Sequence, residues 1–171
     1  IISYGTTTQY FFNLRDAIEA ARVSGKEIFI VRDFEAAYPI DIREDANIVI
    51  NMNSYNITTG NLITNDGTLK IYDTSEEVGS IKTARAIINN GTLNVDKVHI
   101  ENNTNNVTID NKGELDLKNT TIKSNGSYAV STTTQFTMDA NTLLTSTGNY
   151  ALYNSYDGLI LNQGEIDGVY N

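Results

Sequence analysis

Carboxylates, one histidine and ten tyrosines are the side chains of this sequence that could carry chemistry or bind a ligand. Glycoside hydrolysis needs two carboxyl groups that reach one glycosidic bond, and a zinc-type site needs several converging His or Cys ligands. His99 is the only histidine and cysteine is absent, which excludes a multi-histidine or thiolate site. A solvent-facing strand position explains His99 better than a role as general base. Because the sequence also has no Ser-His-Asp order, P-loop or dinucleotide fingerprint, it predicts no catalytic residues, no metal and no cofactor.

The chain repeats itself, and the repeat decides which side chains can meet. Short apolar bursts end at Asn or Gly corners, as in residues 86–103. One anchor position holds Leu69, Leu93, Leu115, Phe136 and Leu159. These anchors are 24, 22, 21 and 23 residues apart, and each is followed two residues later by another apolar residue. Self-similarity at this period is typical of a stacked solenoid.

Two further apolar columns accompany the anchor. One lies seven residues after it, at Ile100, Ile122, Leu143 and Ile166. The other precedes it, at Ala86-Ile87, Val107–Ile109, Ala129-Val130 and Ala151-Leu152. Three short strands in each coil of about 22 residues predict an all-β fold, a single-stranded parallel β-helix. We expect it to be right-handed, as parallel crossovers nearly always are. The 22 Asn and 21 Thr residues suit this fold, because Asn tolerates left-handed corners and Thr favours strands.

The first 25 residues follow a helical pattern instead. Four apolar residues lie on one helical face: Leu14, Ala17, Ile18 and Ala21. Asn13 is suited to begin this helix and Gly25 to end it. We predict a helix over about residues 14–23 that covers the open end of the solenoid; the alternative is an independent amphipathic interaction helix. Residues 1–46 would then form the cap and first coil, and 47–171 the repeats, which we expect to continue beyond this chain.

Composition narrows the possible partners. The net charge is −9 and the isoelectric point about 4.4, which argues against nucleic acid and anionic membrane surfaces, since both attract basic proteins. No apolar run approaches 18 residues, so no membrane insertion is expected. The absence of cysteine rules out disulfides but is compatible with secretion, because many secreted proteins of Gram-positive bacteria also lack it.

Four segments, 13–21, 25–30, 40–42 and 47–53, resemble the start of pectate-lyase-like β-helix proteins. Residues 86–95, AIINNGTLNV, are similar to the coil repeat of large surface proteins and adhesins of gut Firmicutes. This resemblance implies a secreted or cell-surface bacterial protein, a non-enzymatic adhesin that binds a host glycan or an extracellular protein. The same scaffold also carries enzymes. A polysaccharide-active lyase or glycoside hydrolase is therefore the alternative, and a spacer that holds another domain away from the cell wall is a third.

The rows of outward-facing side chains help to decide between a binding protein and an enzyme. Resemblance to a pectate lyase would imply clustered Asp ligands for calcium and a basic Arg or Lys. The first outward row is Lys70, Asn94, Asp116, Thr137 and Ile160. The second is His99, Thr121, Thr142 and Glu165, and the third is Glu101, Lys123 and Asp167, interrupted by Leu144. Because these rows give no pair of carboxylates, a non-catalytic role is favoured, and Glu101 and Lys123 are expected to form an exposed ion pair.

Two features are candidates for binding. The polar segment 73–80 contains Asp73, Glu76 and Glu77, and we expect it to bulge from one corner as a binding loop; a solvated insertion without function explains it equally well. Tyr128 and Tyr150 each precede an Ala in consecutive coils, so we expect their rings to stack on each other. Such a stack could bind a sugar or protein, or it could fix the register of the coils.

Overall fold

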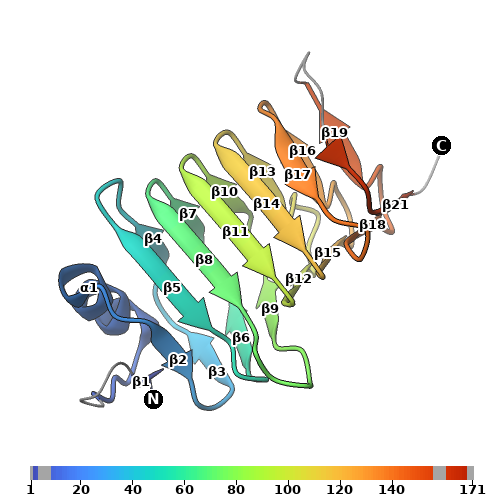
Figure 1. Ribbon diagram of the computed structural model, residues 1–171. Helices are drawn as coiled ribbons and strands as arrows, with labels where there is room; N and C mark the ends of the chain where they lie inside the picture. The colour runs from blue at the N-terminus through green and yellow to red at the C-terminus, as the bar shows by residue number, and fades with distance from the viewer. Residues whose placement is uncertain (1, 4–8, 156–160, 169–171) are drawn as a thin grey trace.

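In this computed structural model, residues 2, 3, 9–155 and 161–168 are described. The described residues contain one helix and 21 strands, arranged as three sheets around one core (Figure 1). Sheet A contains β1 (Ile2–Ser3), β2 (Ile28–Ile30), β5 (Asn47–Asn51), β8 (Thr68–Tyr72), β11 (Thr92–Asp96), β14 (Glu114–Lys118), β17 (Phe136–Met138) and β20 (Leu161–Asn162). Sheet B contains β3 (Phe34–Ala36), β6 (Asn56–Thr59), β9 (Ser80–Thr83), β12 (His99–Asn102), β15 (Thr121–Ser124), β18 (Leu143–Ser146) and β21 (Glu165–Gly168). Sheet C contains β4 (Ile40–Ile42), β7 (Ile63–Asn65), β10 (Ile87–Asn89), β13 (Ile109–Asn111), β16 (Val130–Thr132) and β19 (Leu152–Asn154).

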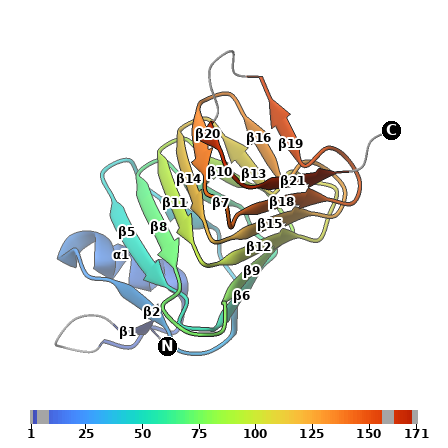
Figure 2. The same cartoon turned by 45° about the vertical axis from the view of Figure 1, so that its right-hand side comes forward.

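Each coil runs through sheet A, then B, then C. Every strand from β2 onward pairs in parallel with its equivalent one coil away, and only β1 is antiparallel to its neighbour β2. In Figure 1 the chain descends along sheet A at the front, returns behind it, and advances from the N-terminal end, which makes the coil right-handed. Figure 2 shows sheets A and B meeting along one corner of the solenoid. The predicted parallel β-helix is confirmed.

The anchor column is confirmed where the structure describes it. Leu69, Leu93, Leu115 and Phe136 are in register on β8, β11, β14 and β17 and are all buried. Leu159, like Ile160 of the first outward row, lies outside the described residues. The register of the last coil is wrong in our prediction, because Leu161 pairs with Thr137 rather than with Met138. Three consecutive apolar residues, 159–161, fit a strand in either register, so the apolar pattern could not fix this one.

The second column contains a similar correction. Ile100, Ile122 and Ile166 are in register as predicted, but Leu144 completes the column and is fully buried. Leu143 instead stands in the outward row with Thr121 and Glu165, where we had placed Thr142, and Thr142 is buried. The cause is the corner at 139–142, which makes Leu144 the eighth residue after Phe136. The third column is confirmed as Ile87, Ile109, Val130 and Leu152.

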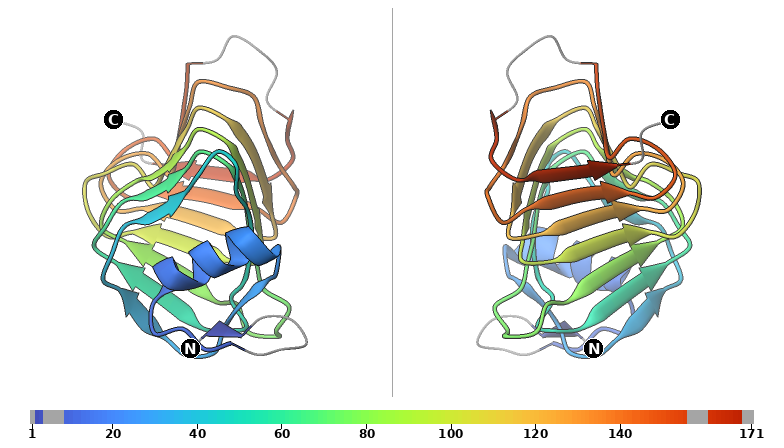
Figure 3. Two further views of the ribbon diagram at one scale, coloured as in Figure 1. Left: turned by 90° about the vertical axis from the view of Figure 1, so that its left-hand side faces the viewer. Right: turned by 90° about the vertical axis from the view of Figure 1, so that its right-hand side faces the viewer.

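The predicted helix is confirmed as α1 (Leu14–Ser24). Its buried face is the predicted one, Leu14, Ala17, Ile18 and Ala21. The helix lies across the N-terminal end of the solenoid (Figure 3) and contacts β2, β4 and β5. Asn13 caps its start, with the Asp16 N–H donating to Asn13 Oδ1 at 2.9 Å. Gly25 ends it in a left-handed conformation, with φ of 66°. The helix therefore covers the apolar interior of the first coil.

Replacement of the helix cap gives a first test. We expect Asn13→Ala to lower the free energy of unfolding by about 1 kcal/mol, because the Asp16 N–H loses its acceptor at the helix start. The measurement is the urea midpoint of the variant against the parent. Asn13→Ser, which keeps a side-chain acceptor, should restore most of the loss, and equal losses for Ala and Ser would contradict the capping role.

Buried asparagine side chains form a ladder of hydrogen bonds from coil to coil, at the corner between sheets C and A. Asn65, Asn89 and Asn111 are the last residues of β7, β10 and β13, and none is exposed. Asn65 Nδ2 donates to Asn89 Oδ1 and Asn89 Nδ2 donates to Asn111 Oδ1, each at 2.7 Å. Asn111 Nδ2 then donates to the Thr132 hydroxyl at 3.0 Å. Among the described residues, Asn65 Oδ1 is the one buried side-chain polar atom without a partner, because Ile42, its neighbour in the previous coil, has no side-chain donor.

This ladder corrects the role expected for asparagine. The corners were expected to use Asn for a left-handed backbone, yet among the described residues only Asn53 and Asn119 combine asparagine with positive φ. The ladder residues instead satisfy buried polar groups of neighbouring coils. Two residues after Asn89, Gly91 lies against the backbone of the preceding coil. An added Cβ would stand 2.0 Å from the Gly67 carbonyl oxygen. That corner therefore requires glycine for space rather than for its dihedral angles.

Candidate ligand-binding groove

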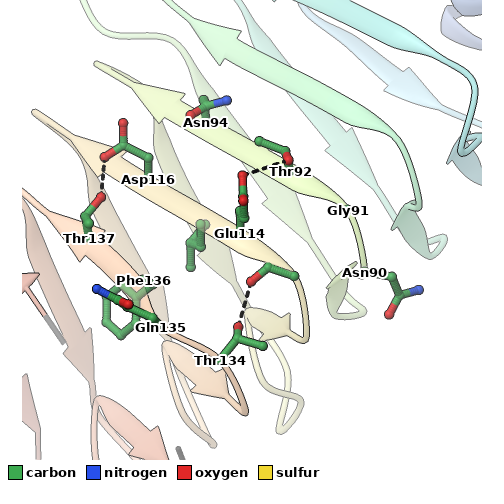
Figure 4. A pocket seen from close by; sticks show the side chains of 12 residues that line it. Asn90, Gly91, Thr92, Asn94, Glu114, Asp116, Thr134, Gln135, Phe136 and Thr137 are labelled. Atoms are coloured by element: carbon green, nitrogen blue, oxygen red, sulfur yellow. Dashed lines mark hydrogen bonds between the residues drawn. The ribbon is translucent and has the colours of Figure 1, made fainter. Parts of the chain in front are cut away.

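An open groove of about 740 Å³ lies on the outer face of sheet A. It crosses β11, β14 and β17 and reaches the corner at which these strands begin (Figure 4). It is lined by Asn90, Gly91, Thr92, Asn94, Gly113, Glu114, Leu115, Asp116, Thr134, Gln135, Phe136 and Thr137. Leu115 and Phe136 point into the core, being 4% and 1% exposed, so the polar groups that the groove presents are the amides, hydroxyls and carboxylates of the other lining side chains.

Two of the lining residues are carboxylates on one strand. Glu114 and Asp116 are two residues apart on β14, so both side chains point outward. Asp116 accepts from Thr137 Oγ1 at 2.6 Å and forms an ion pair with Lys118 at 2.5 Å. This hydrogen bond with Asp116 raises the pKa of Lys118 above its ordinary value. Glu114 is exposed and accepts only a hydrogen bond from Thr92 Oγ1, at 3.2 Å, among the contacts of the described residues.

The remaining polar side chains repeat from coil to coil. Asn94, Asp116 and Thr137 are in register on three neighbouring strands, and Figure 4 shows them in one row across the sheet. Equivalent positions in neighbouring coils are about 4.8 Å apart. The groove therefore offers a hydrogen-bonding side chain at regular intervals along the solenoid axis. No Lys or Arg is among its lining residues.

The two carboxylates also bear on catalysis. Alternate residues of a strand are about 6.6 Å apart along its axis, which is close to the lower limit of about 6.5 Å between the two carboxyl groups of inverting glycosidases. Hydrolysis would require one of the two to be protonated as a general acid. Asp116 is already engaged in an ion pair with Lys118 and a hydrogen bond from Thr137, so the arrangement suits hydrogen bonding better than proton donation.

The sequence placed part of the lining of this groove on the outer face of the solenoid but predicted no binding site there. Asp116, Asn94 and Thr137 are in the outward row as predicted. Glu114 was missed because it stands one step outside that row, although the alternation of residues 114–118, ELDLK, already places it on the face of Asp116. Gln135 was missed because no pattern indicates a ligand-facing role for a residue just before a strand.

In the predicted binding loop, residues 73–80, the first residue departs most from the prediction. Asp73 is 5% exposed, and its Oδ2 accepts from the N–H groups of Ser54 and Gly79 at 2.9 and 2.8 Å. Its Oδ1 accepts from the Ser75 N–H at 2.8 Å. Burial alone would raise the pKa of Asp73, but these backbone N–H groups outweigh burial and lower it. Asp73 is therefore buried and holds the loop together instead of facing solvent, whereas Glu76 and Glu77 are exposed as expected.

Asp73 provides a second prediction. We expect Asp73→Asn to lower the free energy of unfolding at neutral pH by about 1–3 kcal/mol, because the amide nitrogen cannot accept from the facing N–H groups. Since the folded pKa of Asp73 is lowered, its stabilisation exists above the ordinary pKa of about 4 and disappears as the pH falls through the folded value. Urea midpoints of parent and variant should therefore converge in acid. A constant difference across that range would contradict the role of the charge.

The tyrosines are arranged differently from the prediction. Tyr128 and Tyr150 occupy equivalent places in consecutive coils. Within the described part of the chain, however, the ring of Tyr128 contacts Tyr153, with centroids 5.1 Å apart and planes inclined by 31°. The predicted stack of Tyr128 on Tyr150 is therefore wrong. Tyr150 and Tyr153 are 45% and 48% exposed. Tyr128 and Tyr150 precede β16 and β19, and Tyr153 is in β19. None of the three lines the groove or belongs to the segment 73–80, so the structure does not join the predicted binding residues into one site.

A half-buried phenol, Tyr72, lies on the same sheet as the groove. The Tyr72 hydroxyl donates to Glu27 Oε1, and Lys70 Nζ lies 4.6 Å from the centre of the Tyr72 ring. Burial, followed by the hydrogen bond and negative charge of Glu27, raises the pKa of Tyr72 to about 12. The folded state thus favours the neutral phenol.

This shift predicts how stability depends on alkaline pH. The contribution of Tyr72 should be complete below about pH 10, the ordinary tyrosine value, and should be lost as the pH rises to the folded pKa of about 12. We expect the urea midpoint of the parent to exceed that of Tyr72→Phe near neutral pH and the gap to close over this window. A gap that stays constant to the upper end of the window would contradict the assignment.

The other predicted contacts lie on sheet B. Lys123 Nζ is 2.9 Å from Glu101 Oε1, which confirms the ion pair. His99 is exposed, opposite Ser80 of the previous coil. Across the described ranges, no three His, Cys, Asp or Glu side chains come together to form a possible metal site. No helix in the described part of the chain combines the length and apolar character needed to cross a membrane. Comparison with protein-family models, curated proteins and solved structures finds no match to this chain.

Proposed function

We propose that this chain is a non-enzymatic binding module, a β-helix displayed outside a bacterial cell that acts as an adhesin for a host glycan or extracellular protein. The observation that carries the proposal is the groove on sheet A, which offers amides, hydroxyls and carboxylates in register over three coils. Such a surface can hydrogen-bond a ligand over an extended length. Location at the bacterial surface rests on the resemblance of the coil repeat to Firmicutes surface proteins.

The chemistry of the groove favours binding over catalysis. A lyase or hydrolase needs a group that donates or removes a proton within reach of one sugar. Asp116 is engaged with Lys118 and Thr137, and Glu114 is open to solvent, so neither lies in an enclosed site of the kind in which a carboxyl group acts as a general acid. Both carboxylates can accept hydrogen bonds from hydroxyl groups.

Glycoside hydrolysis is the second candidate, favoured by the spacing of the same two carboxylates on β14. Incubation with pectin, other uronic-acid polymers and neutral polysaccharides, with and without calcium, separates the two functions. We expect no unsaturated product and no new reducing ends, together with saturable binding to an immobilised ligand. Product formation that Glu114→Gln or Asp116→Asn abolishes would overturn the binding proposal in favour of an enzyme.

A further inference from the structure

The charge and composition of the groove define the class of ligand it can take. Resting on the binding function proposed above, we infer that the groove binds uncharged glycan chains along the solenoid axis and rejects uronic-acid and sulfated polymers. The resemblance to pectate-lyase-like proteins alone would suggest an acidic polymer, so the electrostatics of this groove lead to the opposite expectation.

The first argument is the sign of the charge. The lining contains two carboxylates and no Lys or Arg. Lys118 neutralises Asp116 from the end of β14, whereas Glu114 has no cationic partner in the described ranges of the chain. The chain as a whole carries a net charge of −9. A polymer with one negative charge on each sugar would meet like charges in the groove and across the surface, which suppresses association.

The second argument is the kind of side chain. Protein interfaces draw most of their affinity from buried aromatic, apolar or Arg anchors, and the side chains exposed in this groove include none of these. Hydroxyl groups, in contrast, can donate to the carboxylates of Glu114 and Asp116 in charge-assisted hydrogen bonds. The amides of Asn94 and Gln135 can both donate and accept. The surface therefore fits a ligand rich in hydroxyl groups better than a protein.

The third argument is the repeat. The row of Asn94, Asp116 and Thr137 recurs at about 4.8 Å, which is comparable to the rise per sugar of an extended β-1,4-linked chain. A chain that runs along the axis would meet one strand with each sugar. Three strands border the groove, so affinity should increase from mono- to trisaccharide and then level off.

A glycan array that carries uncharged, uronic-acid and sulfated oligosaccharides tests the inference with the intact chain as probe. We expect binding to uncharged members only, little affected by salt because no ion pairs form with the ligand. Titration of an uncharged hit should show about tenfold weaker binding for Glu114→Gln and for Asp116→Asn, as expected for loss of a charge-assisted hydrogen bond. Glu44→Gln, an exposed carboxylate outside the groove, should bind like the parent.

The possible failures are distinguishable. Binding to uronic-acid or sulfated members, or uncharged hits that tolerate both groove substitutions, would overturn the inference and leave the binding function standing. The same holds if extracellular matrix proteins bind and no glycan does. An array without hits, together with no protein binding, would overturn the inference and the proposed function together.

Discussion

Gly91→Ala should lower the free energy of unfolding by more than about 4 kcal/mol, near the upper end of single-substitution effects. The added Cβ would stand 2.0 Å from the Gly67 carbonyl oxygen and 2.8 Å from the Asp66 carbonyl carbon. Both obstacles are backbone, so no rotamer change can relieve the clash. The same corner carries hydrogen bonds between coils, from Thr92 N to the Gly67 oxygen and from Glu114 N to the Gly91 oxygen, each at 2.8 Å, and any shift would weaken them.

Gly60 is the matched control for this substitution. A Cβ on Gly60 would meet no atom within 4 Å, and its φ is not in the left-handed region. Gly60→Ala should therefore be neutral or stabilise the protein by about 0.4–1 kcal/mol, because alanine restricts the unfolded chain. Urea unfolding of the two variants beside the parent gives the comparison. Similar midpoints for Gly91→Ala and the parent would contradict the close approach of the coils at this corner.

Asn89→Ala should cost about 3–5 kcal/mol, since it removes the central member of the buried ladder. Asn89 accepts from Asn65 Nδ2 and donates to Asn111 Oδ1, both at 2.7 Å, and also donates to the Glu114 carbonyl oxygen at 2.8 Å. Without its amide, Asn111 Oδ1 would be left buried without this donor. The side-chain volume would become a cavity in a column where every described neighbour is fully buried.

The neighbouring asparagine provides the control. Asn90 is exposed, and its amide donates to Asp66 Oδ1 at 2.7 Å at the surface. Asn90→Ala should change the free energy of unfolding by only about 0.5 kcal/mol, as is usual for surface positions. Calorimetric or urea unfolding of both variants beside the parent gives the two changes in the free energy of unfolding. Equal losses at 89 and 90 would show that the ladder has no special energetic role.

The features that sequence reasoning recovered depend on local patterns repeated many times. The coil period and the anchor column through Phe136 follow from apolar residues two apart, repeated in each coil, because that alternation puts one face of every strand in the core. The cap helix follows from a 3.6-residue pattern between Asn13 and Gly25. Each of these signals is complete within a short segment, so no knowledge of the tertiary structure was needed.

Register in the last coils was decided by corner lengths. Where Leu143 and Leu144 are adjacent, or where residues 159–161 are all apolar, alternation is satisfied in two registers, and the pairing with the previous coil selects one. Leu144 is selected because the corner before it is one residue longer than in the preceding coil. Chain segments that leave the sheet carry no alternating pattern, which is why their length could not be converted into a register.

In the groove and in the loop at 73–80, some features also follow from the sequence and others only from the tertiary structure. The sequence determined that Glu114 and Asp116 share a face of one strand, but only parallel pairing of β11, β14 and β17 brings Asn94 and Thr137 beside them. For Asp73, the polar sequence around it predicts exposure, whereas in the fold two N–H groups of the loop and that of Ser54 from the previous coil point at its carboxylate, and Asp73 is buried. Local alternation fixes which side of a strand a residue faces. Contacts between coils and backbone donors from distant turns decide what it meets there, because those groups come together only after the chain has wound on itself.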